Sequence, residues 1–430
     1  MTDLIIIGAG PGGYETAIEA AHRGMTVTLI NDGPLGGVCL NEGCIPTKTF
    51  CHHAGITPFG EAAERKAAVV EQLRNGVAYL LNNERITLVE GHAAFKDAAT
   101  VVVGDEEYQA RDIIIATGSR AARLPIAGVD LPLVLDSTDV LALSELPATV
   151  CVIGGGVIGL EMASYLHRFG CQVTVLEYAP QVLPAFDAEV SKRLKMMLSR
   201  QGIKIETDAQ VTAVNEEGVV TYINKKGKTL EVVAEKVLMA VGRAPRTEGL
   251  NLEAAGIDYG RKGIVVDENM ATTASHVYAI GDVNGKMMLA HVASFQGVRA
   301  LNHIQGKADK IRFDLVPAAV FTTPEVATVG RTEAQCDDEE LDYSVSKALY
   351  GANGKAVAMD ATDGFCKLLV DNATGQLLGC HIIGAHSSDI IHEVTALMNL
   401  GATVEQARDI IHAHPTLSEV FQMALHSIRN

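Results

Sequence analysis

The sequence predicts an α/β protein with two dinucleotide-binding folds, followed by an α+β region at the C-terminal end. One observation behind this prediction is an internal repeat, in which residues 3–31 and 149–177 share a layout. Each copy has a short apolar segment, a glycine-rich turn, a helical segment and a second apolar segment. The other observation is a change of pattern near Val316, after which short apolar strands precede two helical segments, 388–400 and 403–411.

Composition places the chain among globular proteins. Its 430 residues, 48% of them hydrophobic, suffice for about three domains of roughly 150 residues. The 35 basic and 52 acidic residues give a net charge of −17, which argues against a nucleic-acid partner. The start MTDLIII lacks the basic region of a signal peptide, and no apolar run reaches the roughly 18 residues of a membrane span. Eight cysteines are too few for a secreted disulfide scaffold, so we expect a cytoplasmic protein.

Glycine occupies the first, third and sixth positions of both turns. The first glycine permits a tight turn, the second lets the backbone approach a pyrophosphate, and the third allows close packing of helix on strand. The phosphates then lie at the helix N-terminus. One such motif alone could be ordinary turn chemistry, but two in strand–turn–helix context predict two Rossmann-like folds. The motifs are Gly8-Ala9-Gly10-Pro11-Gly12-Gly13 and Gly154-Gly155-Gly156-Val157-Ile158-Gly159.

The residue that ends the second strand of each repeat indicates which nucleotide binds. Glu177 follows VTVL, where a carboxylate can bond a ribose 2′-hydroxyl and repel a 2′-phosphate, so NAD is favoured over NADP. The alternative is an ordinary polar residue at a strand end. The first repeat has Asn31 instead, whose amide can still bond a ribose, and the neighbouring Asp32 is a second candidate for that contact.

Two cysteines follow the first repeat in the segment GGVCLNEGCIPTK. Cys39 and Cys44 do not fit a zinc site, because no second pair of ligands follows at the required distance, and we expect no metal. On an ideal helix their five-residue step rises about 7.5 Å, so a disulfide between them requires a distorted turn and is easily reduced. Pro46 predicts that Cys44 lies near a helix N-terminus, where a thiolate is stabilised. The alternative is two ordinary thiols in a glycine-rich loop.

Nine motifs, in this order along the chain, resemble those of the flavoprotein pyridine nucleotide–disulfide oxidoreductases, and most closely the dihydrolipoamide dehydrogenases among them. The resemblance runs nearly from end to end of the chain. The motifs are GAGPGG, CLNEGCIPTK, ATGS, GGGVIGLE, VGRAP, AIGD, MLAH, FTTPEVATVG and HAHPTLSE.

The resemblance implies four segments. They are an FAD-binding domain (1–145), an NAD-binding domain (146–268), a central segment that returns to FAD (269–315) and a C-terminal α+β dimerisation, or interface, domain (316–430). We therefore expect a homodimer.

The resemblance also implies roles for the matching polar residues near the cysteines. Cys39 is expected to exchange with substrate, and Cys44 to present its thiolate to the flavin. Lys48 and Glu161 are expected to form an ion pair near the reactive flavin nitrogen.

The HAHPTLSE motif implies that His414, oriented by Glu419, is the base and is supplied by the partner subunit. An imidazole titrates near neutrality, and a carboxylate on its other nitrogen holds the tautomer. Glu419 has an alternative role, because Thr416-Leu417-Ser418-Glu419 also reads as a capping box for the last helix. His412 is expected to be structural.

Cofactor contacts follow from the motifs and the resemblance together. For FAD they are Gly8, Gly10, Gly13, Asn31, Asp32, Gly37, Val38, Lys48, Ala93, Thr117, Gly118, Ser119, Asp282, Met288, Leu289, Ala290 and His291. For NAD they are Gly154, Gly156, Val157, Ile158, Gly159, Glu161, Glu177, Val211 and Gly242.

Three features depart from the family pattern. Asn31 stands where an acidic residue usually contacts the FAD ribose, residues 51–85 form a shorter segment than usual, and Phe295-Gln296-Gly297 replaces a common acidic pair before glycine. The short segment is expected to run along the approach to Cys39, so substrate access or carrier docking can differ here.

The expected activity is oxidation of dihydrolipoyl groups to the lipoyl disulfide with reduction of NAD⁺. The partner would be a lipoyl-bearing carrier protein of a 2-oxoacid dehydrogenase complex or of the glycine cleavage system. One alternative is an NAD(P)H-dependent reductase of a low-molecular-weight disulfide, similar to glutathione reductase. Mercuric reductase is disfavoured because the C-terminus, HSIRN, lacks a cysteine pair. Another alternative is a non-catalytic nucleotide-binding subunit.

Overall fold

The computed structural model describes residues 2–428, and the chain divides into two compact units. Unit 1 comprises Met1–Arg123, Asp136–Glu145 and Gly242–Ile311. Unit 2 comprises Leu124–Leu135, Leu146–Val241 and Arg312–Asn430. Each unit contains one glycine-rich repeat, and each is described by itself below.

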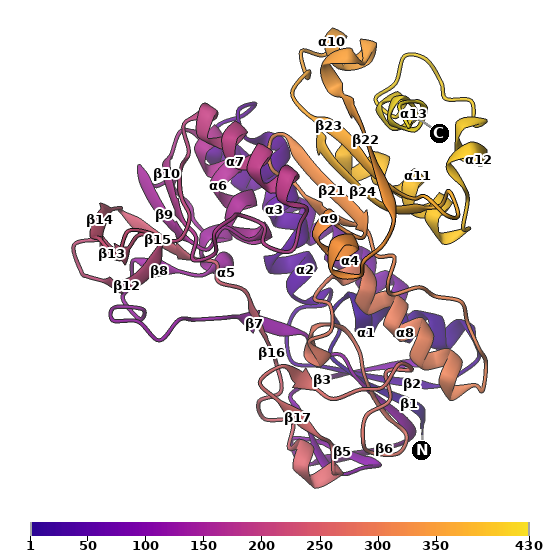
Figure 1. Cartoon of the computed structure of the whole chain (residues 1–430). Helices are drawn as coiled ribbons and strands as arrows, with labels where there is room; N and C mark the ends of the chain where they lie inside the picture. The colour runs from indigo at the N-terminus through magenta and orange to yellow at the C-terminus, as the bar shows by residue number, and fades with distance from the viewer. Residues whose placement is uncertain (1, 429–430) are drawn as a thin grey trace. The chain divides into compact units, whose positions relative to one another are not determined.

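The first repeat forms the centre of a parallel sheet in unit 1 (Figure 1). The parallel strands, in spatial order, are β3 (Ile86–Glu90), β2 (Val27–Asn31), β1 (Thr2–Ile7), β6 (Glu106–Ile115) and β19 (Val277–Ala279). Leu4 to Ile7 of β1 are all buried, because both neighbours of β1 and the layers on both faces cover this strand. The predicted strand–helix–strand unit at residues 3–31 is confirmed.

Two helices lie side by side against this sheet. α1 (Pro11–His22) leads from β1 to β2, and α8 (Ala290–Ile304) packs along it (Figure 1). Ala17, Ala20 and Ala21 of α1 are buried, as their helical spacing predicts.

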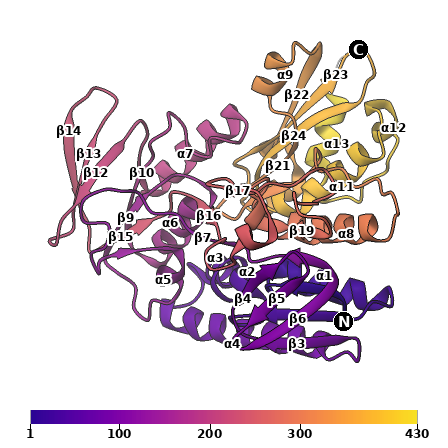
Figure 2. The same cartoon turned by 90° about the horizontal axis from the view of Figure 1, so that it is seen from below.

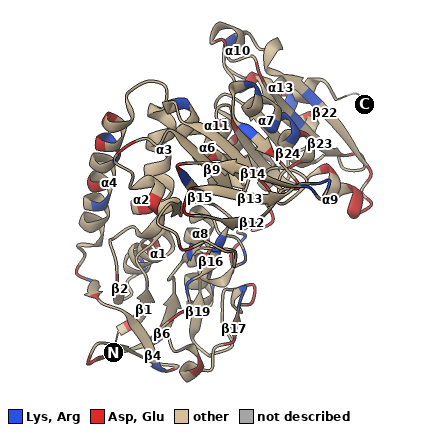
Figure 3. Cartoon of the chain, turned by 90° about the vertical axis from the view of Figure 1, so that its left-hand side faces the viewer, with Lys and Arg blue, Asp and Glu red and all other residues tan. Residues whose placement is uncertain are grey.

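Shorter elements complete unit 1. An antiparallel extension contains β4 (Ala93–Asp97), β5 (Thr100–Val103) and the first residues of β6, and a two-stranded sheet contains β7 (Ser119–Ala121) and β16 (Arg243–Pro245). The helices are α2 (Gly37–Glu42), α3 (Cys44–His53), α4 (Phe59–Leu81) and α5 (Ser137–Leu141). Both acidic and basic residues occur along α4, the helix within the short 51–85 segment (Figure 3).

The second repeat forms a five-stranded parallel sheet in unit 2. Its strands, in spatial order, are β11 (Lys204–Glu206), β10 (Gln172–Leu176), β9 (Thr149–Ile153), β15 (Lys236–Met239) and β8 (Val134–Leu135). Its helices are α6 (Val157–Phe169) and α7 (Ala188–Gln201). The antiparallel strands β12 (Gln210–Val214), β13 (Val219–Ile223) and β14 (Thr229–Val233) form a separate small sheet beside it (Figure 2).

The C-terminal part of unit 2 is an antiparallel sheet covered by helices. Its strands, in spatial order, are β20 (Ala318–Val320), β21 (Glu325–Gly330), β24 (Leu377–Gly384), β23 (Phe365–Asp371) and β22 (Tyr343–Leu349). Its helices are α9 (Glu333–Asp338), α10 (Gly354–Ala358), α11 (Ser387–Asn399), α12 (Val404–Arg408) and α13 (Glu419–His426). One hydrophobic core joins this sheet to α11 and α13. The predicted fold class is therefore confirmed.

The helix expected at 403–411 ends earlier than predicted, at Arg408. The Thr403 side chain accepts the Gln406 N–H and caps the start of this short helix. The segment from residue 409 to residue 418 is consequently a loop that carries both His412 and His414.

Among residues 2–428, which the structure describes, no helix combines the length and the hydropathy needed to cross a bilayer.

Candidate active site

Cys39 and Cys44 lie together at a break between two helices. Cys39 is in α2 and Cys44 begins α3, and Gly43 separates the helices with φ −145° and ψ −108°. A Cβ at Gly43 would lie 3.0 Å from the Val38 oxygen and 3.3 Å from the Cys39 Cα, so a side chain there would press on the last turn of α2. On one continuous helix the two cysteines would be too far apart to touch. With the break at Gly43, their thiols are instead close enough to be hydrogen bonded to each other.

The electrostatics of the pair follow from that contact. Both side chains are half-buried, and neither cysteine is in a disulfide in this structure. The hydrogen bond with Cys44 and burial raise the pKa of the Cys39 thiol far above its ordinary range, and the charge of Lys48 acts in the opposite direction. Cys44 is the first residue of α3, as Pro46 predicted, so its sulfur lies at the positive end of a helix.

The cysteine loop is attached to the glycine-rich turn of the first repeat. The Gly36 N–H donates to the Ala9 oxygen at 2.9 Å. Gly37 has φ +58°, and a Cβ there would overlap the Gly10 Cα. Asn41 braces the same loop from within, because its Nδ2 donates to the Leu35 oxygen at 2.9 Å and to the Gly37 oxygen at 2.8 Å. The sequence prediction omitted Asn41, although its position between the two cysteines is a signal that could have identified it.

The outer glycines of both motifs are required by packing within the protein. A Cβ at Gly8 would overlap the Ala116 oxygen, and a Cβ at Gly154 would overlap the Ala240 oxygen. The sixth-position glycines, Gly13 and Gly159, would likewise overlap the oxygen of the first glycine of their own motif.

The third-position glycines, in contrast, face open space. A Cβ at Gly10 or at Gly156 would have no protein atom within 4 Å, and both residues have extended backbone that any residue can adopt. Glycine is therefore not required there by the protein itself, which is what a close ligand approach predicts. Both residues are helix N-caps without a side-chain capping bond, so the helix N–H groups are free for phosphate oxygens.

A second helix N-terminus adjoins the first motif. A Cβ on Gly12 of α1 would lie 3.1 Å from the Ala293 Cβ in the first turn of α8, and a Cβ on Gly281 would lie 3.0 Å from the same atom. The predicted FAD contacts Met288 and Leu289 precede α8, and the contacts Ala290 and His291 begin it. Two helix starts with uncapped N–H groups therefore meet, which suits a pyrophosphate.

The residues at the ends of β2 and β10 brace the two glycine-rich turns in the same way. The Ala9 N–H donates to Asn31 Oδ1 at 3.0 Å, and the Gly155 N–H donates to Glu177 Oε2. The neutral Asn31 thus reproduces the turn-bracing contact of Glu177, although it lacks the charge.

Asp32 is held in an ion-pair cluster of unit 1. Its Oδ2 lies 2.8 Å from Arg246 Nη2 and 3.1 Å from His92 Nδ1. His92 immediately precedes the predicted FAD contact Ala93, which begins β4. The cluster therefore gathers Asp32 and Ala93 at one edge of the parallel sheet.

The predicted contacts Thr117, Ser119 and Asp282 are also brought together. Ser119 Oγ donates to Asp282 Oδ2, and Thr117 Oγ1 donates to the Arg246 oxygen at 2.7 Å. Gly118 has φ +74° and open space for a Cβ, so its backbone conformation rather than its packing favours glycine.

Arg243 is the central cation of this group and was missed by sequence reasoning. Its Nε donates to Ser119 Oγ at 2.6 Å, its Nη2 donates to the Ser119 oxygen at 2.8 Å, and Nε lies 3.8 Å from Asp282. The signal was available in the VGRAP motif, from which only Gly242 was chosen.

The remaining predicted NAD contacts are divided between the units. Gly242 lies in unit 1, where its oxygen accepts the Ala122 N–H at 3.0 Å. Val157, Ile158 and Gly159 form the first turn of α6, and Val211 lies in β12, all in unit 2.

The predicted ion pair of Lys48 with Glu161 joins residues of different units. Lys48 lies on α3, and Glu161 lies buried on α6, where its Oε1 accepts the Phe321 N–H at 2.9 Å. The ion pair itself stays a prediction.

His414 and Glu419 form a hydrogen-bonded pair on the loop before α13. His414 Nδ1 lies 2.9 Å from Glu419 Oε1, and the His414 side chain is 77% exposed. The Thr416 N–H donates to Glu419 Oε2 at 2.7 Å. This N–H and the His414 ring lower the pKa of Glu419, so the carboxylate is ionised near neutrality and holds the Nδ1–H tautomer.

The capping-box alternative for Thr416 and Glu419 is wrong in part. The N-cap of α13 is Ser418, without a side-chain cap, rather than Thr416. Glu419 does accept the Thr416 N–H, so it has both a structural contact and the contact with His414.

His412 lies in the same loop in a different environment. Its ring is 5% exposed, its Nε2 lies 2.7 Å from Glu393 Oε1 of α11, and its Nδ1 lies 3.1 Å from the Ile410 oxygen. These contacts, with an edge contact to the Phe421 ring, anchor the loop that presents His414.

Known proteins are similar to this chain along nearly its whole length. Residues 2–297 match the family model described as pyridine nucleotide-disulphide oxidoreductase, and residues 316–425 match the dimerisation domain of that family. A dihydrolipoyl dehydrogenase of Bacillus subtilis (strain 168) is 36% identical over 446 residues, covering 98% of this chain and 97% of the relative. A dihydrolipoyl dehydrogenase of Geobacillus stearothermophilus is 39% identical, covering 97% and 94%.

Solved structures show the same fold over the whole chain. The HOCl-induced flavoprotein disulfide reductase RclA from Escherichia coli superposes with a TM-score of 0.92 at 33% identity, covering 99% of this chain and 100% of that one. LpdA from Mycobacterium tuberculosis superposes with a TM-score of 0.90 at 26% identity, covering 99% of each chain. Members of this group combine FAD with a pyridine nucleotide. The chain thus belongs to the pyridine nucleotide–disulphide oxidoreductase family, with that family's dimerisation domain at its C-terminal end.

Proposed function

We propose that this protein oxidises dihydrolipoyl groups: dihydrolipoyl dithiol + NAD⁺ → lipoyl disulfide + NADH + H⁺. The observation that carries the proposal is the direct contact of Cys39 and Cys44 at the break between α2 and α3. Two thiols in contact beside a flavin-type cradle can hold one electron pair as a dithiol and give it up when they form a disulfide. The names of relatives 36–41% identical over nearly the full chain support the dihydrolipoyl substrate.

The protein's own residues would divide the thiol chemistry. In the resting enzyme Cys39 and Cys44 form the disulfide, and a substrate thiolate attacks the Cys39 sulfur to release the Cys44 thiolate. The second substrate thiol then displaces Cys39, so that the substrate leaves as the disulfide and both cysteines are reduced. Gly8, Gly10 and Asp282 would hold FAD, which would supply the two-electron redox chemistry that links the cysteine pair to NAD⁺.

His414 is the base that we propose for the proton of the substrate thiol. Its Nδ1 bond to Glu419 leaves Nε2 as the nitrogen that accepts a proton from the substrate thiol, and the ionised Glu419 stabilises the resulting imidazolium. We propose that His414 serves the cysteines of the partner subunit in a homodimer. The match of residues 316–425 to a dimerisation domain supports this arrangement.

NAD⁺ rather than NADP⁺ is proposed as the acceptor. The Glu177 carboxylate is held at the end of β10 by the N–H groups of Gly155 and Ala179, the latter at 2.6 Å. A fixed anion beside the ribose bonds a 2′-hydroxyl and repels a 2′-phosphate. The proposed source of the dihydrolipoyl group is a carrier protein of a 2-oxoacid dehydrogenase complex or of the glycine cleavage system.

A second candidate is a reductase that works in the opposite direction on another disulfide, at the expense of NAD(P)H. The observation in its favour is the full-length superposition on RclA, which is named a disulfide reductase. Steady-state assays that compare lipoamide with glutathione disulfide, and NADH with NADPH, separate the two candidates. The dihydrolipoyl proposal predicts a higher kcat/KM for lipoamide and for NADH.

The variant Cys44→Ser tests the exchange mechanism that both candidates share. We expect loss of nearly all NADH formation from dihydrolipoamide while flavin binding is retained. A near wild-type rate in this variant contradicts the mechanism.

A further inference from the structure

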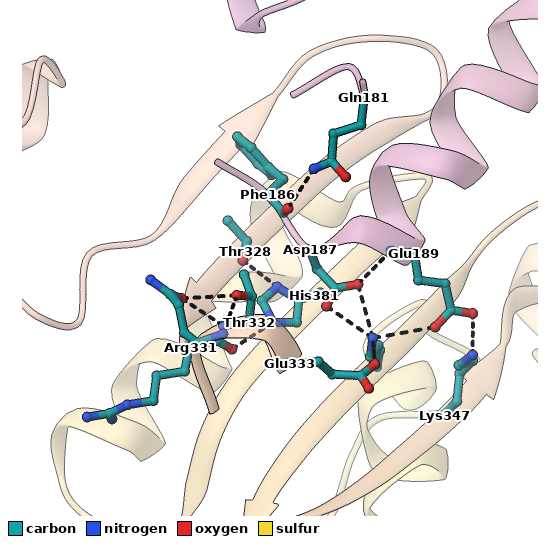
Figure 4. A network of polar contacts seen from close by, with 12 residues as sticks. Gln181, Phe186, Asp187, Glu189, Thr328, Arg331, Thr332, Glu333, Lys347 and His381 are labelled. Atoms are coloured by element: carbon teal, nitrogen blue, oxygen red, sulfur yellow. Dashed lines mark hydrogen bonds and ion pairs between the residues drawn. The ribbon is translucent and has the colours of Figure 1, made fainter. Parts of the chain in front are cut away.

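A buried lysine of the C-terminal sheet is ion-paired with the start of α7, a helix of the second nucleotide-binding fold. Figure 4 shows the carboxylate groups of Asp187, Glu189 and Glu333 gathered at this place. Lys367 of β23 is 1% exposed, and its Nζ lies 3.0 Å from each carboxylate oxygen of Asp187, which is 2% exposed. Nζ also lies 3.5 Å from Glu189 Oε2 and pairs with Glu333. Breaking a buried pair leaves an uncompensated charge, so this contact fixes its two ends firmly.

The ammonium group occupies the centre of an acidic cluster. Oxygen atoms of Asp187, Glu189 and Glu333 all lie within 4.8 Å of one another, a spacing that could suit a metal ion. Lys367 supplies the cation instead, and the carboxylates outweigh the effect of burial and raise its pKa. The cluster therefore connects β23 to α7 by ion pairs between side chains of the protein itself.

Asp187 marks the end of the loop that follows the second repeat. It is the N-cap of α7, and its Oδ1 accepts the Glu189 N–H at 3.1 Å as well as the bond from Lys367. The loop spans residues 178–187 and begins directly after Glu177 at the end of β10. The bond from Lys367 thus reaches the residue at which this loop ends and α7 begins.

The same loop rests on the glycine-rich motif of the second repeat. The Leu183 N–H donates to the Gly155 oxygen at 2.9 Å. A Cβ on Gly155 would lie 3.1 Å from Val182 on one side and 3.1 Å from the Glu177 Cβ on the other. Gly155 is therefore enclosed between the loop and Glu177.

Leu183 has an unusual backbone conformation that its surroundings must maintain. Its φ is +46°, in the left-handed region that non-glycine residues rarely adopt. Its oxygen accepts the Phe186 N–H at 2.9 Å and Ser191 Oγ at 3.3 Å, and both donors lie within four residues of Asp187. A shift of Asp187 would thus be transmitted to Leu183 and to Gly155.

We propose that Lys367 is a positioning residue for the pyridine nucleotide, which acts through Asp187 and loop 178–187 on the glycine-rich turn. This inference rests on the proposed nucleotide site in the second repeat. It assigns to the C-terminal sheet a role in nucleotide affinity in addition to dimerisation.

The test compares Lys367→Met and Asp187→Asn with wild type as FAD-loaded holoenzymes. Methionine retains much of the length of the lysine side chain without its charge. Asparagine retains an acceptor for the Glu189 N–H, so α7 stays capped in Asp187→Asn. This variant therefore still tests the proposal if Lys367→Met folds poorly. The matched control is Lys347→Met on β22, which removes the same charge from a lysine that is 34% exposed and pairs with Glu189.

Disulfide-exchange enzymes of this type have two separate half-reactions, so kcat/KM for each substrate reports one half-reaction. We expect kcat/KM for NAD⁺ to fall about tenfold and the Kd for NADH to rise about tenfold in both test variants. We expect kcat/KM for dihydrolipoamide to change less than twofold, and Lys347→Met to resemble wild type. A merely structural role would lower both kcat/KM values in proportion, and that result, or unchanged nucleotide constants, overturns the proposal.

Gly156→Val separates this inference from the site on which it rests. Its side chain would enter the open space that faces the proposed pyrophosphate. Retention of normal NADH binding by Gly156→Val contradicts the nucleotide site itself. Loss of binding in Gly156→Val together with wild-type binding in Lys367→Met and Asp187→Asn contradicts the positioning role alone.

Discussion

Asn31 accepts the Ala9 N–H through Oδ1 at 3.0 Å and thereby fixes the first glycine-rich turn. In the second repeat the Glu177 carboxylate makes the equivalent bond with Gly155. The bond needs an acceptor at the strand end but not a charge, which explains how the first turn keeps its geometry without the acidic residue usual in the family. A ribose hydroxyl would still find the Asn31 amide and the neighbouring Asp32.

The contact between Asn31 and Ala9 leads to a prediction about flavin retention. Asn31→Ala removes an acceptor worth about 1 kcal/mol, so we expect FAD to dissociate about five times more readily. Asn31→Asp keeps an acceptor and is expected to bind FAD like wild type. The measurement is the Kd for FAD from fluorescence after reconstitution of the apoenzyme. Equal Kd values for all three proteins would show that the turn does not need this bond.

His414 and Glu419 are expected to contribute unequally to the rate. His414→Gln should lower kcat/KM for dihydrolipoamide by about 10²–10⁴, the usual contribution of a general base. Glu419→Gln should cost about tenfold, because the amide can still accept from Nδ1 but does not stabilise the imidazolium. Stopped-flow reduction of the holoenzyme by dihydrolipoamide gives both values. A wild-type rate for His414→Gln would remove His414 from the mechanism.

Gly43 should be necessary for the contact between the cysteines. A side chain there would press on the Val38 oxygen and the Cys39 Cα, so Gly43→Val is expected to separate α2 from α3 and slow the exchange at least tenfold. Gly60→Val in α4 is the matched control, because a Cβ at Gly60 has no protein atom within 4 Å. The rate of holoenzyme reduction by dihydrolipoamide is the readout. If both variants react like wild type, the break at Gly43 does not control the pair.

Stability is expected to depend on pH through His381. Its ring is 1% exposed between Thr328 Oγ1 at 2.6 Å and the Arg331 oxygen at 2.8 Å, and burial lowers its pKa. The unfolded chain therefore binds a proton at a pH where the folded chain does not. Stability from this group is present above pH 6.5 and decreases below it, by up to about 1.4 kcal/mol per pH unit.

The variant His381→Gln provides the comparison, because an amide can donate and accept without titrating. Urea unfolding at pH 7.5 and 5.5 should show a larger loss of unfolding free energy in wild type than in the variant. Asp187 adds little to this difference, since Lys367 lowers its pKa in spite of burial, and it stays ionised over the range. Equal losses in both proteins would contradict the assignment.

Local patterns were sufficient to predict the repeats and most of the fold. The partnership of His414 with Glu419 was implied by the family resemblance. The strand–helix–strand units at 3–31 and 149–177 and the helix start at Cys44, in contrast, are encoded by adjacent residues. Such features depend on periodicity and on glycine or proline at fixed positions, which a single sequence displays.

Contacts between segments that are far apart in the sequence could not be predicted from local patterns. Lys367 and Asp187 are 180 residues apart, and no sequence motif at either position indicates which residue it pairs with. Arg243 lies within a quoted motif, but its bonds to Ser119 exist only because β16 pairs with β7. The predicted end of the helix at 403–411 was too late, because apolar residues such as Ile410 continue the pattern beyond the capped helix.

The most direct test of the account is to map thiols in the oxidised holoenzyme and after anaerobic addition of one equivalent of dihydrolipoamide without NAD⁺. Alkylation followed by peptide mass spectrometry reports each cysteine, and Cys51 on the same helix as Cys44 serves as the internal control. We predict that Cys39 and Cys44 are protected before the addition and that Cys39 becomes alkylated after it, with Cys51 unchanged. If Cys39 and Cys44 are each alkylated to the same extent before and after the addition, the proposed disulfide exchange is contradicted.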